Sequence, residues 1–272
     1  MLNRNNLSFF FILLFSASLF AQIGGLSASK LAALNTETVP QFTIEFEPSF
    51  NFGYAKNRWN IYGHVEPMFK KNDSLETHSE MDFRFTYGIT SKWEMGFSLP
   101  SDASYLSFGS KFRFWEMKNI SLALLNGFNL LLGNHRYCTK YAQNNSTSYA
   151  INPLLGLAIS YRFSRRFSVD INPVFQSHFD PNAAHFGRHL DSFINADFGY
   201  YLWPKFQTIL GIYYFTMNTP SRSHKQKLSL NPGFTLEKAK HFILVLNFPV
   251  DIWGINSDRQ AGCGFALTIW IN

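Results

Sequence analysis

The chain has 272 residues and a formal net charge of +6, with 15% charged and 18% aromatic residues, including 30 phenylalanines. This length suits one large all-β domain, and so aromatic and weakly charged a composition is unusual for a soluble exported domain. The modest positive charge comes without a basic run or an aromatic-basic motif, which argues against nucleic-acid binding.

The N-terminal stretch MLNRNNLSFFFILLFSASLFAQ has the features of a secretory signal peptide. One Arg4 precedes an apolar run from Leu7 to Phe20, and small residues lead to Ala21. A membrane anchor helix is the alternative, but the run is short for a full span and no cationic residue follows closely. We predict a cleaved signal peptide over residues 1–21. No later segment is apolar enough for a transmembrane helix, so the exported chain can enter a membrane only as a closed barrel.

Residues 22–40, QIGGLSASKLAALNTETVP, show no alternation. Ser27 could cap a short helix over residues 28–34. We expect a periplasmic N-terminal segment, which could rest in the periplasmic mouth of the barrel, stay loose, or tether another periplasmic component.

Residues 42–54, FTIEFEPSFNFGY, alternate between apolar and polar side chains. A period of two indicates a strand with two unlike faces. In a soluble sandwich the aromatic face would be buried against a second sheet. In a membrane barrel it would face lipid, and the glutamates would line the interior.

The same alternation recurs to the end of the chain. After 42–54 it predicts strands at residues 80–89, 93–99, 106–114, 120–131, 149–161, 167–176, 192–200, 206–215, 227–235, 242–250 and 262–271. Residues 59–69 also alternate, but a spanning strand there would make the count odd and place the N-terminus outside the cell. We therefore assign them to an outer excursion and predict an all-β, antiparallel transmembrane barrel of about 12 strands over residues 41–272.

The connections between these strands are alternately short and long. The long ones lie near residues 55–78, 132–147, 178–190, 216–226 and 251–260, with a shorter one near 100–104. A soluble sandwich has no reason to gather its long loops at one end. An outer-membrane barrel does so, with short periplasmic turns and long outer loops.

The barrel interpretation assigns each strand residue to a face. The residues of the first strand that we expect to face lipid are Phe42, Ile44, Phe46, Phe50 and Phe52. Those that we expect in the lumen are Glu45, Glu47, Glu80, Asp82, Arg84, Glu94, Lys111, Arg113, Asp170 and Asn172. Charges of both signs on neighbouring strands will pair, so the lumen residues form a structural network, a ligand path with an electrostatic filter, or both.

Aromatic residues flank the predicted short turns, as in the girdles at the boundary between lipid and water. The interface candidates are Tyr87, Trp93, Trp115, Tyr161, Tyr200 and Trp203. Strand-end aromatics also occur in soluble proteins, but their presence at four turns favours the girdle.

Several short motifs resemble the phenol meta-pathway degradation barrels of the outer membrane. They are TYGITSKWEMGFSLP (86–100), LSFGSKFRFWE (106–116), LLLGN (130–134) and YRFSRRFSVDINP (161–173). The matching positions of the turn and the next strands are Tyr87, Gly88, Thr90, Lys92, Glu94, Gly109, Lys111 and Arg113, whereas Thr86 and Ser91 replace the usual Arg and Asp. The resemblance spans residues 38–272 and implies a transporter or channel without established catalytic residues.

Two other groups of residues could carry chemistry. His178, His185 and His189 crowd one outer loop and are weak candidates for a metal site, but solvated loop histidines are commoner, so we predict no metal and no cofactor. No Ser-His-Asp arrangement can be assembled in one compartment, and we predict no enzyme, although a lipid-modifying or hydrolytic site on the strands remains an alternative. Cys138 and Cys263 could pair, but sequence cannot fix the geometry.

The sequence therefore predicts a passive transporter or channel in the cell outer membrane for small molecules, hydrophobic ones included. The alternative is a closed structural or adhesive barrel that binds a partner through its outer loops. Lipid is the expected partner, nucleic acid is not, and neither the solute nor the oligomeric state can be read from the sequence.

Overall fold

The computed structural model describes residues 23–27, 31–69, 74–132, 151–177, 190–218, 224–239 and 242–271. The predicted signal peptide (1–21) lies outside this part of the chain. Within the described ranges, no helix has the length and apolar character needed to cross a membrane.

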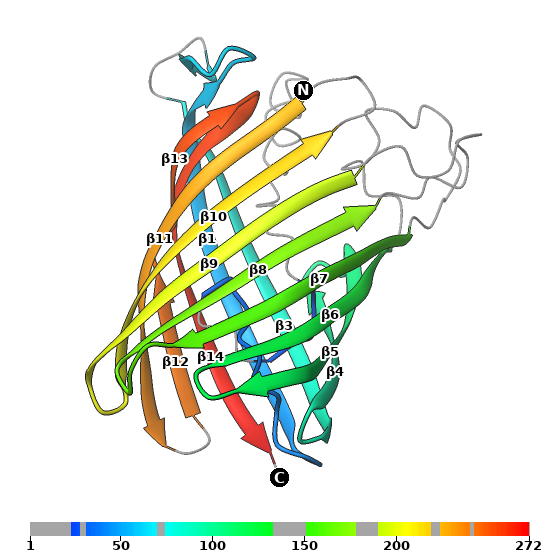
Figure 1. Cartoon of the computed structure of the whole chain (residues 1–272). Helices are drawn as coiled ribbons and strands as arrows, with labels where there is room; N and C mark the ends of the chain where they lie inside the picture. Colours follow the sequence, from blue (N-terminus) through cyan, green and yellow to red (C-terminus); the bar gives the residue numbers. More distant parts are fainter. Residues whose placement is uncertain are drawn as a thin grey trace, which may run out of the picture.

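The described residues form strands from β1 to β14 (Figure 1). Their bounds are β1 Ile44–Trp59, β2 Val65–Pro67, β3 Glu76–Thr90, β4 Trp93–Pro100, β5 Tyr105–Met117, β6 Ile120–Leu131, β7 Ile151–Arg162, β8 Phe167–Ser177, β9 Leu190–Trp203, β10 Phe206–Asn218, β11 His224–Ala239, β12 Phe242–Asn247, β13 Val250–Ile255 and β14 Ser257–Ile271.

The sheet closes on itself because β14 pairs with β1 along most of its length. β12 and β13 both lie between β11 and β14 and form one strand, interrupted at Phe248 and Pro249. Proline lacks the N–H that a ladder needs, which explains the interruption. β2 pairs only with the outer end of β1. The wall is thus a closed antiparallel barrel of 12 strands, and the predicted fold class is confirmed.

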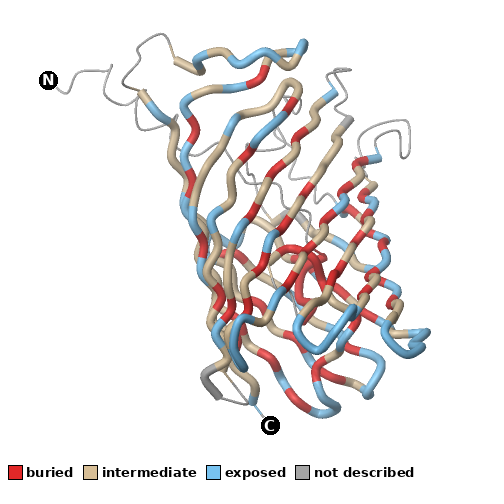
Figure 2. The backbone as a smooth tube through the Cα atoms, turned by 60° about the vertical axis from the view of Figure 1, so that its left-hand side comes forward, coloured by how far each residue is buried: buried red, intermediate tan, exposed pale blue. Residues whose placement is uncertain are grey.

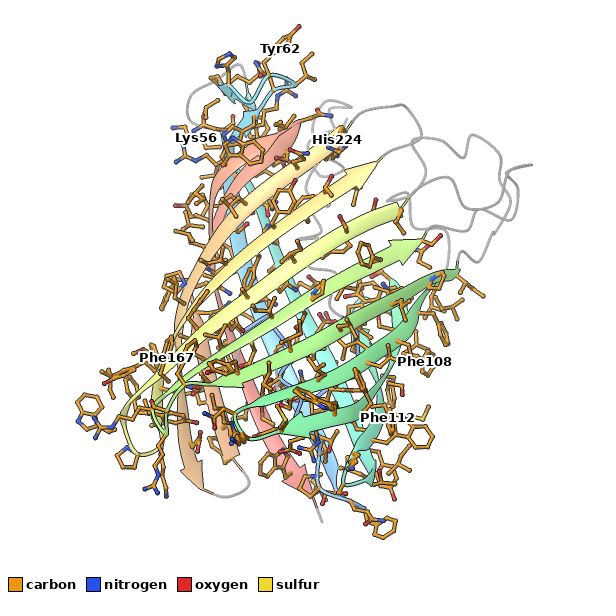
Figure 3. The ribbon with its side chains drawn as sticks, in the orientation of Figure 1. Lys56, Tyr62, Phe108, Phe112, Phe167 and His224 are labelled. Carbon is orange, nitrogen blue, oxygen red and sulfur yellow. The ribbon has the colours of Figure 1, made fainter. Side chains whose placement is uncertain are left out.

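Buried residues alternate with more exposed ones along much of the wall, for example in β7 and β9, and Figure 2 shows this by colour. On the outer surface, phenylalanines from five neighbouring strands form a ladder. Its ring centroids are 4.8 Å apart for Phe46 and Phe85, 5.0 Å for Phe85 and Phe97, 6.4 Å for Phe97 and Phe108, and 4.9 Å for Phe108 and Phe128. Phe108 and Phe112 point outward from β5 in Figure 3. Such cross-strand aromatic pairs stabilise adjacent strands and give the barrel an apolar exterior.

Residues 59–69 form a hairpin at one end of the barrel, here called the outer hairpin, rather than a spanning strand. β2 pairs with the last residues of β1, so the hairpin rises above the barrel with Tyr62 near its tip (Figure 3). The excursion is shorter than residues 55–78, because β1 continues to Trp59 and β3 already begins at Glu76.

Two predicted outer loops are wrong in extent. Residues 251–260 belong to β13 and β14, which meet at a turn on Asn256 (φ 49°). Asp251 there points inward and pairs with Lys227, so its polarity marks the lumen face and not a loop. Residues 216–218 and 224–226 extend β10 and β11, leaving only residues 219–223 between them. The loops predicted near 132–147 and 178–190 fall largely outside the described residues.

Candidate functional site: a lumen occupied by the N-terminal segment

Residues 23–27 and 31–39 of the N-terminal segment, here called the plug, lie inside the barrel and not below it. Ile23, Leu26, Ala33 and Leu34 are almost completely buried, and the blue segments in Figure 1 are enclosed by the strands. The plug has no helix among its described residues, so the predicted helix over 28–34 is wrong for residues 31–34. Their N–H groups donate to side chains of the wall instead of to carbonyls within a helix.

Glycines make room for the plug backbone against β4 and β5. A Cβ on Gly96 would lie 1.9 Å from the carbonyl oxygen of Gly25, and one on Gly109 would lie 2.3 Å from that of Gly24. Gly25 itself has φ +79°, and a Cβ there would lie 2.1 Å from the backbone of Gly96. Only glycine permits both the close approach and this left-handed backbone.

An ion pair from β4 and β5 holds one part of the plug. Lys111 Nζ lies 3.0 Å from Glu94 Oε1, and both side chains are completely buried. Glu94 also accepts hydrogen bonds from the backbone N–H groups of Ser27 (2.8 Å) and Val39 (2.7 Å). Lys111 donates to the carbonyls of Ser27 (3.0 Å) and Asn35 (3.3 Å). The charges of the pair are therefore solvated by the main chain of the plug.

Asp197 on β9 holds the next part. Its Oδ2 accepts hydrogen bonds from three successive backbone N–H groups, those of Leu31 (3.1 Å), Ala32 (3.3 Å) and Ala33 (3.0 Å). The hydroxyl of Tyr213 donates to its other oxygen at 2.9 Å. Three convergent N–H groups offset the charge of the carboxylate, as in anion-binding backbone concavities.

Asn172 and Ser160 continue this contact along the plug. The Asn172 amide accepts from the Leu34 N–H and donates to the Leu34 carbonyl (2.8 Å). Ser160 Oγ accepts from the Thr36 N–H at 3.0 Å and donates to Asp170 Oδ1 at 2.6 Å. At the periplasmic end, Glu37 forms an ion pair with Arg162.

The apolar side chains of the plug pack on the inner wall. Ile23, Leu26 and Leu34 form one buried cluster with wall residues of β6 to β9, namely Ala123, Leu125, Leu154, Ala158, Val174 and Phe193. The sequence analysis predicted a polar interior and missed this patch. The available signal was the apolar character of both faces of β6 and β7 (Ile120–Leu131 and Ile151–Arg162).

A second charged cluster lies beside the plug. Arg84 Nη2 is 2.8 Å from Glu45 Oε1 and 2.7 Å from Glu47 Oε2. The glutamates also accept hydrogen bonds from Trp270 and Thr268 of β14, respectively. This network ties β1, β3 and β14 together where the barrel closes.

The remaining predicted lumen residues lie apart from the plug contacts. Tyr105 donates to Glu80 at 3.4 Å, and Asp82 is on the same inward row of β3. Arg113 does not join the network, because its guanidinium bonds the Ser91 carbonyl (2.9 Å) in a periplasmic turn and lies 3.4 Å from Glu116. Sequence reasoning missed Asp197, Asp191, Lys227 and Asp251, which are buried inward residues of β9, β11 and β13.

The structure places the outward-facing candidates on the barrel exterior. Phe42, Ile44 and Phe52 are exposed, and Phe46 and Phe50 are partly covered by neighbouring rings. Among the interface candidates, Tyr87, Trp93, Trp115, Tyr200 and Trp203 are exposed, and Tyr161 packs edge-on against Phe163 at 4.2 Å. Cys263 is free and exposed on β14, and its possible partner Cys138 falls outside the described residues.

No set of three or more metal-ligating side chains gathers within the described ranges. His178, His185 and His189 lie outside them. The polar groups of the lumen that hold the plug are instead hydrogen-bonded to main-chain atoms.

Comparison with known proteins agrees with this architecture. The sequence profile of a family described as "Membrane bound beta barrel domain (DUF5777)" matches residues 33–248. The crystal structure of the COG4313 outer membrane channel from Pseudomonas putida F1 is similar, with a TM-score of 0.67 and 13% identity over 87% of this chain and 98% of that one. The CymD monoaromatic hydrocarbon channel has a TM-score of 0.52 and 8% identity over 94% and 99%. No curated protein sequence matches this chain.

Proposed function

Because this chain belongs to the DUF5777 family of membrane-bound beta barrels, we propose that it is a passive outer-membrane channel for small molecules that its plug closes at rest. The observation that carries this proposal is the way in which the plug is held. Glu94 and Asp197 accept hydrogen bonds from the plug backbone, Lys111 donates to it and Asn172 does both, and these bonds supply most of the polar contacts of the plug.

Water can replace the plug backbone in these hydrogen bonds without leaving a charged side chain unsolvated. Glu94 and Lys111 lie 3.0 Å apart, so they can stay paired when the plug leaves, and water entering the lumen can occupy the positions of the lost backbone groups. A wall built only of apolar residues could not be wetted so readily. The closed state is favoured by the apolar cluster, since burial of a side chain such as Ile23, Leu26 or Leu34 contributes about 1.5–3 kcal/mol.

The opened lumen would present two unlike surfaces to a solute. The inner faces of β6 to β9 are apolar around Leu125 and Leu154, whereas β1, β3 and β4 carry charged groups such as Arg84. Such a passage suits small amphipathic or hydrophobic molecules. One protein of similar fold is described as a monoaromatic hydrocarbon channel, which fits the apolar side of this passage.

A closed structural or adhesive barrel is the second candidate function. It is favoured by the outer hairpin, where Ile61, Tyr62 and Val65 are exposed at 63%, 77% and 50%. Exposed apolar residues gathered on one hairpin are a feature of partner-binding surfaces. We propose no catalytic activity for the barrel.

Replacing Gly25 with valine tests the channel proposal. A Cβ at this position meets the Gly96 backbone at 2.1 Å, so the plug cannot seat, while the wall itself is unchanged. We expect single-channel recordings in planar bilayers to show at least tenfold more open time than the wild type.

Gly63→Val is the matched control, because Gly63 also has positive φ (+77°) but lies in the outer hairpin with no atom within 3.4 Å of an added Cβ. It should conduct like the wild type. If Gly25→Val neither conducts nor passes small solutes into liposomes, the structural-barrel alternative replaces the channel.

A further inference from the structure

Most of the hydrogen bonds between the wall and the plug are made with peptide groups of the plug. Seven backbone N–H groups of the plug donate to wall side chains: those of Ser27, Leu31, Ala32, Ala33, Leu34, Thr36 and Val39. Four of its carbonyls, those of Gly25, Ser27, Leu34 and Asn35, accept hydrogen bonds from Thr86, Lys111 and Asn172. Every peptide has these groups, whatever its side chains.

Two of these contacts distinguish a peptide from other polar ligands. Asn172 binds both the N–H and the carbonyl of Leu34, and the Glu94–Lys111 pair binds both the N–H and the carbonyl of Ser27. A hydrocarbon or a free carboxylate does not offer a donor and an acceptor with the spacing of one amino-acid residue. Pairing with main-chain groups is how domains that add a strand bind extended peptides with little dependence on sequence.

The shape of the lumen agrees with this chemistry. Gly96 and Gly109 lie side by side on β4 and β5 and meet the carbonyls of Gly25 and Gly24 without any intervening side chain. The two glycines therefore leave room for a bound main chain, and there is no room for a side chain at those positions. Beside it, the apolar cluster receives Ile23, Leu26 and Leu34, so the side chains that fit are branched and uncharged.

We propose that the plug occupies a peptide-binding groove in place of the permeant, and that the channel carries short, uncharged peptides with small and branched apolar side chains. The inference rests on the proposed channel function and specifies its substrate class. The plug then acts as an intramolecular competitor, present at the high effective concentration that tethering provides. A permeant peptide crosses by taking over its hydrogen bonds.

The test uses the full-length chain with both changes confined to the plug, Gly25→Val and Ala33→Pro. The first clashes with Gly96, and the second removes the N–H that Ala33 donates to Asp197, so every wall residue stays native. The probe is acetyl-Leu-Ala-Ala-Leu-Asn-Thr-amide, which copies residues 31–36. Its matched control carries N-methyl groups on the first three residues, with the same side chains but none of the N–H groups that would reach Asp197.

Two readouts are taken on the same protein: block of the current in planar bilayers, and fluorescence anisotropy of C-terminally labelled peptides with the protein in detergent micelles. We expect the unmodified peptide to block and bind at least tenfold more tightly than the N-methylated one. A conducting variant that neither peptide blocks, or that both block equally, overturns the inference and leaves the channel proposal standing.

A variant that never conducts contradicts the channel proposal, and the anisotropy then decides the inference alone. Preferential binding of the unmodified peptide would support the groove. Equal or absent binding would overturn it.

Discussion

Replacing Lys111 with methionine is expected to destabilise the plugged barrel by about 3–5 kcal/mol, because it leaves a buried carboxylate without its cation. Lys111 and Glu94 are both completely buried, and the ammonium lies 3.0 Å from the carboxylate. Methionine retains most of the side-chain volume, so the loss reflects charge and not packing. The change in free energy of unfolding would be measured by urea titration in lipid vesicles, with heat-modifiable gel migration to report the folded fraction.

Two further variants control this experiment. Lys92→Met removes a cation from an exposed periplasmic turn and should change stability by less than about 0.5 kcal/mol. In Lys111→Met combined with Glu94→Gln, no charge remains and the amide oxygen still accepts a hydrogen bond, so part of the loss should be recovered. A cost below about 1 kcal/mol for Lys111→Met alone would mean that water reaches the pair and that the plug does not enclose it.

Replacing Phe50 with arginine is expected to cost about 2–4 kcal/mol of stability in lipid, the penalty for a cation on the lipid face near the bilayer midplane. Phe50 is in the middle of β1, and its ring lies 5.8 Å from that of Phe265 on the outer surface. The same urea titration after refolding into vesicles measures the effect.

Ser49→Arg is the matched control, because Ser49 directly precedes Phe50 in β1 and points to the other face of the strand. Ser49 faces the lumen opposite Asp82, whose Oδ1 has no hydrogen-bond partner within the described residues. An arginine there can pair with that carboxylate, so Ser49→Arg should fold with little loss. Equal costs at both positions would contradict the assignment of faces along β1.

Much of the barrel could be predicted because its strands are amphipathic with a period of two. Alternation such as that of 42–54 reports the environment on both sides of a strand, and the membrane-bound β-barrel inferred from sequence is confirmed. The same reasoning explains why Asp251 was misread. A polar residue such as Asp251 within a short apolar stretch indicates a loop when the sequence is considered alone. Its ion pair with Lys227 shows that it belongs to a strand and faces the lumen.

The plug could not be predicted because its contacts are neither local nor periodic. Leu31 reaches Asp197, which is 166 positions away in the chain, and the plug contributes backbone groups to these contacts, which carry no sequence signal. The inner apolar patch was hidden for a related reason. Where both faces of a strand are apolar, as in β6 and β7, periodicity cannot distinguish lipid from a packed interior.

We infer that the plug lies in the lumen and must move for the channel to open, and a reversible tether between plug and wall tests this claim. The side-chain hydroxyls of Thr36 in the plug and Ser121 on β6 are in hydrogen-bond contact. Thr36→Cys combined with Ser121→Cys, in a chain whose Cys138 and Cys263 are replaced by serine, should therefore form a disulfide. We predict that the oxidised protein stays closed in a planar bilayer and that openings appear after a reductant is added. Equal conductance before and after reduction of a verified cross-link would contradict the claim.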